Sequence, residues 1–128
     1  MNLSPNSSNS SSSNIKFYNL QDVETMCRGN KESILKMVEV FIDQIPKFIN
    51  ELNTAFSDND LLKIKNEVHK IKPTVHFFGA FKLKEQLLVI DGKTVNELGE
   101  IDLKHIIKNI NFYASEVINE LKTDYKIN

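Results

Sequence analysis

The residue in this chain with the clearest chemical potential is a histidine that lies among lysines. Around His69, apolar residues recur at alternating spacings of three and four, which predicts an amphipathic helix with one apolar stripe. At about 100° per residue, His69 falls well away from this stripe, so we expect its ring to be exposed and nucleophilic. A neutral imidazole keeps a free lone pair on one ring nitrogen, which can attack phosphorus. The apolar stripe consists of Leu61, Ile64, Val68, Ile71, Val75 and Phe78.

Cationic residues are expected on the same surface of this helix, because positions three or four apart are neighbours. Lys72 follows His69 by about one turn and can pair with the oxygens of a phosphoryl group, while Lys65 and Lys70 can add weaker, screened attraction. Pro73 should leave the ring uncrowded, and it should bend the helix because proline lacks a backbone donor. We therefore expect phosphoryl chemistry at His69, with Lys72 as its cationic partner.

The run that begins at His69 resembles the signature of histidine phosphotransfer (HPt) domains. That signature has a histidine, any residue, an aliphatic residue, a lysine, a small residue or proline, and a glycine ten positions after the histidine. In this chain the matching residues are His69, Ile71, Lys72, Pro73-Thr74 and Gly79, and the next helix continues the match with Leu83, Leu87 and Ile90-Asp91. The resemblance covers about residues 20 to 124, with Pro73 at a position that is more often glycine in the family.

The resemblance implies a phosphoryl carrier in a multistep two-component phosphorelay. His69 would accept a phosphoryl group from the aspartate of one receiver domain and pass it to another, with Lys72 bound to the phosphoryl oxygens. The expected partners are response-regulator receiver domains, including those of hybrid histidine kinases. The Mg²⁺ ion would belong to the receiver, so we expect no cofactor and no metal site in this chain. The sequence has no glycine-rich phosphate loop, so we expect no ATP-dependent kinase activity of its own.

The distribution of charge favours an acidic partner. Between Leu61 and Lys84 there are six lysines and one acid, Glu67, so this segment carries +5, whereas the net charge of the whole chain is −1. A run of charge is more often an ordinary solvated surface. Because this run surrounds His69, we expect it to be a docking surface for the receiver. The expected docking residues are Lys65, Lys70, Pro73, His76, Gly79 and Lys82.

Two other interpretations of the same residues are open. The chain could be an interaction module that binds a receiver or a histidine kinase as a regulator without carrying phosphate, or it could be a purely structural bundle. A metal site at the two nearby histidines is not expected, because His69 and His76 would lie about 10 Å apart along the helix axis. We assign no role to His105, and Cys27 is expected to be a small buried residue.

The hydrophobic periodicity predicts an all-α fold, an up-and-down antiparallel four-helix bundle with a short extra N-terminal helix. Pro46 should bend its helix without breaking it, and Gly79 and Ala80 should let two helices approach closely. Residues 1–14 are rich in serine and asparagine and are expected to form a disordered tail, which leaves residues 15–128 as the bundle domain. The expected helices span about residues 20–27, 30–56, 60–78, 81–90 and 102–124.

Length and composition narrow the class of protein. A chain of 128 residues with 41% hydrophobic and 26% charged residues is typical of a single globular domain, and its near-neutral charge argues against a nucleic-acid partner. No apolar run approaches the roughly 20 residues that cross a bilayer. The N-terminus lacks a basic start followed by an apolar segment, so we expect no secretory signal. Cys27, the sole cysteine, cannot form an internal disulfide. We expect a cytoplasmic monomer without membrane contact.

Overall fold

The computed structural model describes residues 16–128, and within this range every regular element is a helix. The prediction of an all-α fold is confirmed. The predicted tail, residues 1–14, lies outside the described residues. The six helices are α1 (Gln21–Met26), α2 (Lys31–Ser57), α3 (Leu61–Phe77), α4 (Phe81–Asp91), α5 (Val95–Leu98) and α6 (Leu103–Asp124).

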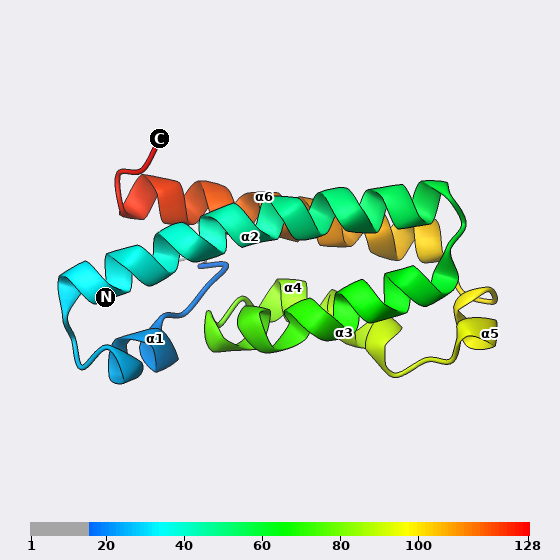
Figure 1. Cartoon of the computed structure of the whole chain (residues 1–128), viewed down its shortest axis with the longest axis horizontal. Coiled ribbons are helices and arrows are strands. Elements are labelled where there is room, and N and C mark those ends of the chain that lie inside the picture. Colours follow the sequence, from blue (N-terminus) through cyan, green and yellow to red (C-terminus); the bar gives the residue numbers. More distant parts are fainter. Residues whose placement is uncertain (1–15) are drawn as a thin grey trace, which may run out of the picture.

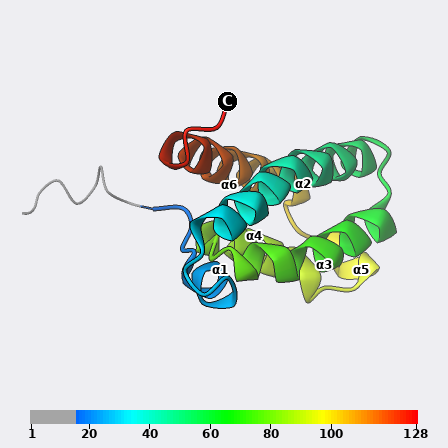
Figure 2. The same ribbon diagram turned by 60° about the vertical axis from the view of Figure 1, so that its left-hand side comes forward.

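The four longest helices pack into a bundle around one apolar core. Helix α2 contacts α3 and α6, and α4 contacts the same two helices from the other side. Figure 1 shows that α2 and α6 form one layer and α3 and α4 the other, and that consecutive long helices run in opposite directions. The turned view in Figure 2 places α1 beside the end of the bundle where α2 begins. The core includes a stacked pair of rings, Phe41 from α2 and Phe78 at the end of α3, with centroids 4.2 Å apart.

Side-chain caps explain where α2 and α3 begin. The Asn30 side chain accepts a hydrogen bond from the backbone N–H of Ser33, and Asp60 accepts one from that of Lys63. Such caps satisfy donors that have no partner inside the helix. Pro46 lies inside α2, which continues past it to Ser57, so the helix is not broken there.

The fold differs from the sequence-based expectation at α5 and at Cys27. Helix α5 was not predicted, although Thr94 and Glu97 form a capping box at its start. Cys27 is only partly buried, and its Sγ lies 3.4 Å from Sδ of Met37.

Residues 16–20, here called the N-terminal strap, lie across the end of the bundle. The Asn19 N–H donates to the carbonyl of Phe78 at 3.2 Å, and the Phe17 N–H donates to Oε1 of Glu120 at 2.7 Å. Asp124, at the end of α6, accepts hydrogen bonds from Nζ of Lys16 at 2.8 Å and from the Tyr18 hydroxyl. The strap therefore ties the start of the described chain to the last helix.

The close approach at Gly79 involves the strap, which corrects the prediction that two helices meet there. Gly79 is buried and has a φ of +61°, in the left-handed region that favours glycine. A Cβ atom at this position would lie 2.2 Å from the Asn19 carbonyl oxygen. Glycine is needed both for the turn after α3 and for the passage of the strap.

None of the helices in residues 16–128 combines the length and the apolar character that a membrane span requires.

Candidate functional site

His69 lies on α3 with its side chain 76% exposed, as the helical phase predicted. Its ring faces the end of α4, the helix that was expected to end at about residue 90. Nδ1 of His69 lies 3.1 Å from Oδ1 of Asp91, the last residue of α4. The ring is therefore held on one side by a carboxylate and open to solvent on the other.

Asp91 is the site residue that sequence reasoning missed. Its side chain is only 14% exposed, and its second oxygen, Oδ2, accepts a hydrogen bond from Nζ of Lys72 at 2.6 Å. One carboxylate from α4 thus contacts both residues that the sequence had singled out on α3. The Ile90-Asp91 pair was noted as part of the HPt resemblance, which was the only signal that pointed to it.

The charges at this site determine which nitrogen of His69 is free. The hydrogen bond from Lys72 lowers the pKa of Asp91, the hydrogen bond from His69 lowers it further, and partial burial opposes both. Asp91 is therefore ionised near neutral pH and can only accept hydrogen bonds. Nδ1 of His69 must then carry the hydrogen, which leaves the lone pair of Nε2 unprotonated in the neutral ring.

His76 has the opposite hydrogen-bond pattern: its Nδ1 atom accepts where that of His69 donates. Nζ of Lys84, on α4, lies 2.9 Å from Nδ1 of His76. An ammonium group can only donate, so Nδ1 of His76 accepts and its lone pair is occupied. In the neutral ring the hydrogen then lies on Nε2, and neither nitrogen has a free lone pair. The hydrogen bonds therefore distinguish His69 from His76 as a nucleophile.

Four of the six predicted docking residues, Lys70, Pro73, His76 and Lys82, are exposed. Pro73 and His76 lie on α3, and Lys82 lies at the start of α4. Lys70 pairs at 3.2 Å with Glu67, three residues earlier on α3, and both side chains line a shallow pocket with residues of α2.

Lys65 and Gly79 do not belong to an open docking surface. Nζ of Lys65 donates to the backbone carbonyl of Lys93 at 2.7 Å, so this lysine caps the chain just beyond α4. Gly79 is buried beneath the strap at Asn19. Fewer lysines are therefore free beside His69 than the sequence predicted. Helical spacing shows which lysines lie near His69, but it does not show which of them bind a backbone carbonyl or a carboxylate.

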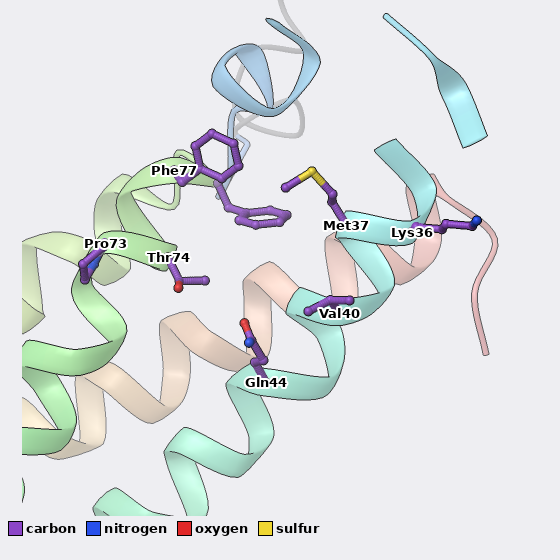
Figure 3. A pocket seen from close by; sticks show the side chains of 8 residues that line it. Lys36, Met37, Val40, Gln44, Pro73, Thr74 and Phe77 are labelled. Atoms are coloured by element: carbon purple, nitrogen blue, oxygen red, sulfur yellow. The ribbon is translucent and has the colours of Figure 1, made fainter. Parts of the chain in front are cut away.

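An apolar groove lies between α2 and α3, on the other side of the His69 helix. It has a volume of about 470 Å³, and here it is called the α2–α3 groove. Figure 3 shows Met37 and Val40 from α2 facing Phe77 from α3, with Pro73 and Thr74 farther along α3. Val40 is 54% exposed, so an apolar side chain at this groove is open to solvent. The full lining is Lys36, Met37, Val40, Gln44, Pro73, Thr74, Phe77 and Phe78.

No group of three or more histidine, cysteine, aspartate or glutamate side chains within residues 16–128 is arranged to hold a metal ion.

Comparison with known protein families gives a match over half of the chain. A family model described as Hpt domain matches residues 36–100, which is 65 of the 128 residues and runs from α2 to just after α5. The matched region contains His69, Lys72 and Asp91. No curated protein and no solved structure matches the chain significantly.

Proposed function

This chain belongs to the Hpt domain family, whose members are phosphotransfer modules of two-component signalling that interact with receiver domains, and we propose that it carries the phosphoryl group on Nε2 of His69. The observation that supports this assignment is the hydrogen bond between His69 and Asp91. It leaves Nε2 unprotonated and solvent-facing, whereas the corresponding lone pair of His76 is occupied by Lys84. The protein relays the group between the aspartates of receiver domains in the cytoplasm and acts as a monomer.

The transfer step needs no base from this chain. The Nε2 lone pair forms the N–P bond while the P–O bond of the receiver's aspartyl phosphate breaks, and its electron pair leaves with the aspartate carboxylate. The hydrogen on Nδ1 stays in place, so the phosphorylated ring becomes a cation that faces Asp91. Onward transfer is the reverse reaction with a second receiver. The receiver supplies the Mg²⁺ ion, as in the implied relay.

Lys72 is the cation that would meet the phosphoryl group. Asp91 holds its ammonium group beside the His69 ring by the 2.6 Å contact, and this limits the positions that the flexible side chain can adopt. In a loose phosphoryl-transfer transition state, negative charge is spread over the three equatorial oxygens, and a nearby ammonium group stabilises it. Lys72 therefore acts by binding phosphoryl oxygens.

The receiver would dock across α3, with apolar contact in the α2–α3 groove. This groove reaches Pro73, four residues after His69, so a partner that covers His69 can also contact the groove. Exposed Val40 and the flexible side chain of Met37 offer an apolar surface that can adapt to a partner. The docking surface that we propose consists of Val40, Lys70, Pro73, His76, Phe77 and Lys82.

The carrier assignment is tested with phosphoramidate, a small phosphodonor that loses ammonia when it phosphorylates a histidine. The wild-type chain should gain one phosphoryl group by intact mass, in an acid-labile form, and His69→Gln should gain none. His76→Gln is the matched control, because it removes an exposed histidine from the same helix, and it should load like the wild type. Circular dichroism should show unchanged helix content in both variants, since both sites face solvent.

Labelling of His69→Gln to the wild-type level would contradict the assignment. A wild-type chain that binds a purified receiver domain but accepts no phosphoryl group would instead support the non-phosphorylated interaction module.

A further inference from the structure

Asp91 lies where it can act on the phosphorylated ring as well as on the free one. Resting on the proposed function, we propose that Asp91 sets the lifetime of the phosphohistidine: by keeping Nδ1 protonated, it makes His69 a donor that releases its phosphoryl group readily. Asp91 is a positioning residue in this role, since it contacts the ring and not the phosphorus atom.

The charged groups around His69 favour retention of the Nδ1 proton. On α4, Oδ1 of Asp91 lies 3.1 Å from Nδ1, so the charged ring would face a carboxylate at hydrogen-bond distance. On α3, Lys72 shares that carboxylate through Oδ2, and Lys65 is turned away to the carbonyl of Lys93. His76 lies about two turns away and is bonded to Lys84. An anion at this distance favours the protonated ring, while the charge of Lys72 reduces the effect without cancelling it.

Protonation at Nδ1 decides how well the ring leaves phosphorus. When the N–P bond of a protonated ring breaks, the electron pair returns to Nε2 and a neutral imidazole leaves. The phosphoryl group passes to a receiver carboxylate, or to a water molecule that releases a proton to solvent. When the ring has lost its Nδ1 proton, the same cleavage must expel an imidazolate anion, which is a much poorer leaving group. A carboxylate that retains the proton therefore keeps the phosphohistidine labile to higher pH.

The experiment compares the decay of phospho-His69 in the wild type and in Asp91→Asn. Asparagine keeps an acceptor oxygen and a similar shape but removes the charge. The full chain is loaded with phosphoramidate and freed of the donor, and loss of the phosphoryl group is followed by intact mass between about pH 6 and about pH 9. The lifetime is measured on whatever fraction is loaded, so slow loading of a variant does not alter the result.

Asp91→Asn should lower, by about one unit, the pH at which the decay rate falls to half its maximum. Near pH 8, this gives the variant a phosphohistidine that lasts roughly ten times longer than that of the wild type. Asp91→Glu, which restores the charge, should return the profile toward that of the wild type. The matched control is Glu85→Gln, which removes a carboxylate from an exposed position of the same helix and should leave the profile unchanged.

An identical pH profile in the wild type and Asp91→Asn would overturn the inference, and so would a shorter lifetime in the variant, which would mean that Asp91 shields the phosphoryl group. Either result leaves the carrier assignment intact, because loading on His69 is established separately. Failure of the wild type to load on His69 contradicts the proposed function instead.

Discussion

At the scale of single residues, the site is defined by one carboxylate with two partners. Asp91 accepts from His69 at one oxygen and from Lys72 at the other, so the ammonium group of Lys72 is already paired before any phosphoryl group arrives. An incoming phosphoryl group must therefore compete with Asp91 for this lysine. Lys72 consequently contributes less free energy to binding the phosphoryl group than an unpaired lysine would, but its ammonium group is better positioned.

Replacement of Lys72 by alanine should slow phosphorylation of His69 without preventing it. The variant loses one charge-assisted contact to the phosphoryl oxygens, which corresponds to about 2 kcal/mol and a tenfold to hundredfold decrease in the rate of loading by phosphoramidate. The control is Lys84→Ala, which removes a lysine that contacts His76. An equal loss of rate in the two variants would mean that Lys72 contributes only general surface charge.

Residue patterns predicted the part of this site that lies within α3, but not the contacts that α3 makes with other parts of the chain. The exposure of His69 and its proximity to Lys72 follow from helical phase within α3, which the spacing of apolar residues reveals. Asp91 lies 22 residues away on α4, and the register between two packed helices is not visible in either helix alone. The same limit explains why the capping role of Lys65 was missed: its acceptor, the carbonyl of Lys93, lies 28 residues away, just beyond α4.

At the scale of elements, Lys65 stabilises the end of α4, the helix end that carries Asp91. Lys65→Ala should destabilise this end, since it removes the ammonium group that donates to the Lys93 carbonyl. We expect a decrease of about 1 kcal/mol in the free energy of unfolding, or about 4 °C in Tm, measured by thermal denaturation. Lys82→Ala, at an exposed position of α4, should leave Tm nearly unchanged. Equal Tm values for the two variants would show that the cap at Lys93 contributes nothing.

A second prediction at this scale concerns Gly79, in the turn between α3 and α4. Gly79→Ala should lower the free energy of unfolding by about 3 kcal/mol in urea titrations, because it combines a left-handed residue with a collision at Asn19. Gly29→Ala is a matched control: Gly29 also has a positive φ, of +73°, but its Cβ would meet nothing within 4 Å. This control should decrease stability by only about 1 kcal/mol. Similar losses in both variants would indicate that the strap moves aside easily.

Elements were easier to predict than their contacts. The caps at Asn30 and Asp60 could be predicted because each one acts within four residues of its own helix. Helix α5 has an equally local signal in its Thr94 and Glu97 capping box, but its four residues are too few for a periodic apolar pattern. The role of Gly79 could not be read from the sequence, since the strap that crosses it begins some 60 residues earlier.

At the scale of the whole molecule, two partly exposed aspartates hold distant parts of the chain together. Asp91 joins α4 to α3, and Asp124 joins the end of α6 to the strap. In both cases a lysine is the main partner: the hydrogen bond from Lys16 lowers the pKa of Asp124, and that from Tyr18 lowers it further. The stability of the fold should therefore depend on the ionisation of these two carboxylates.

This dependence gives a prediction for acid conditions. The pKa of Asp124 is lower in the folded chain than in the unfolded one, so its stabilising contribution is present above the unfolded pKa, about 3.9, and is lost as the pH falls through the folded value. Urea titrations should thus show a free energy of unfolding that decreases from about pH 5 toward about pH 2. Asp124→Asn should lower stability at neutral pH and make this decrease smaller, because the titrating group is gone. Glu39→Gln, which changes an exposed acid in the middle of α2, serves as the control. If Asp124→Asn shows the same decrease with acid as the wild type, the strap is not held by the charge of Asp124, and its attachment depends on the backbone hydrogen bonds of Phe17 and Asn19.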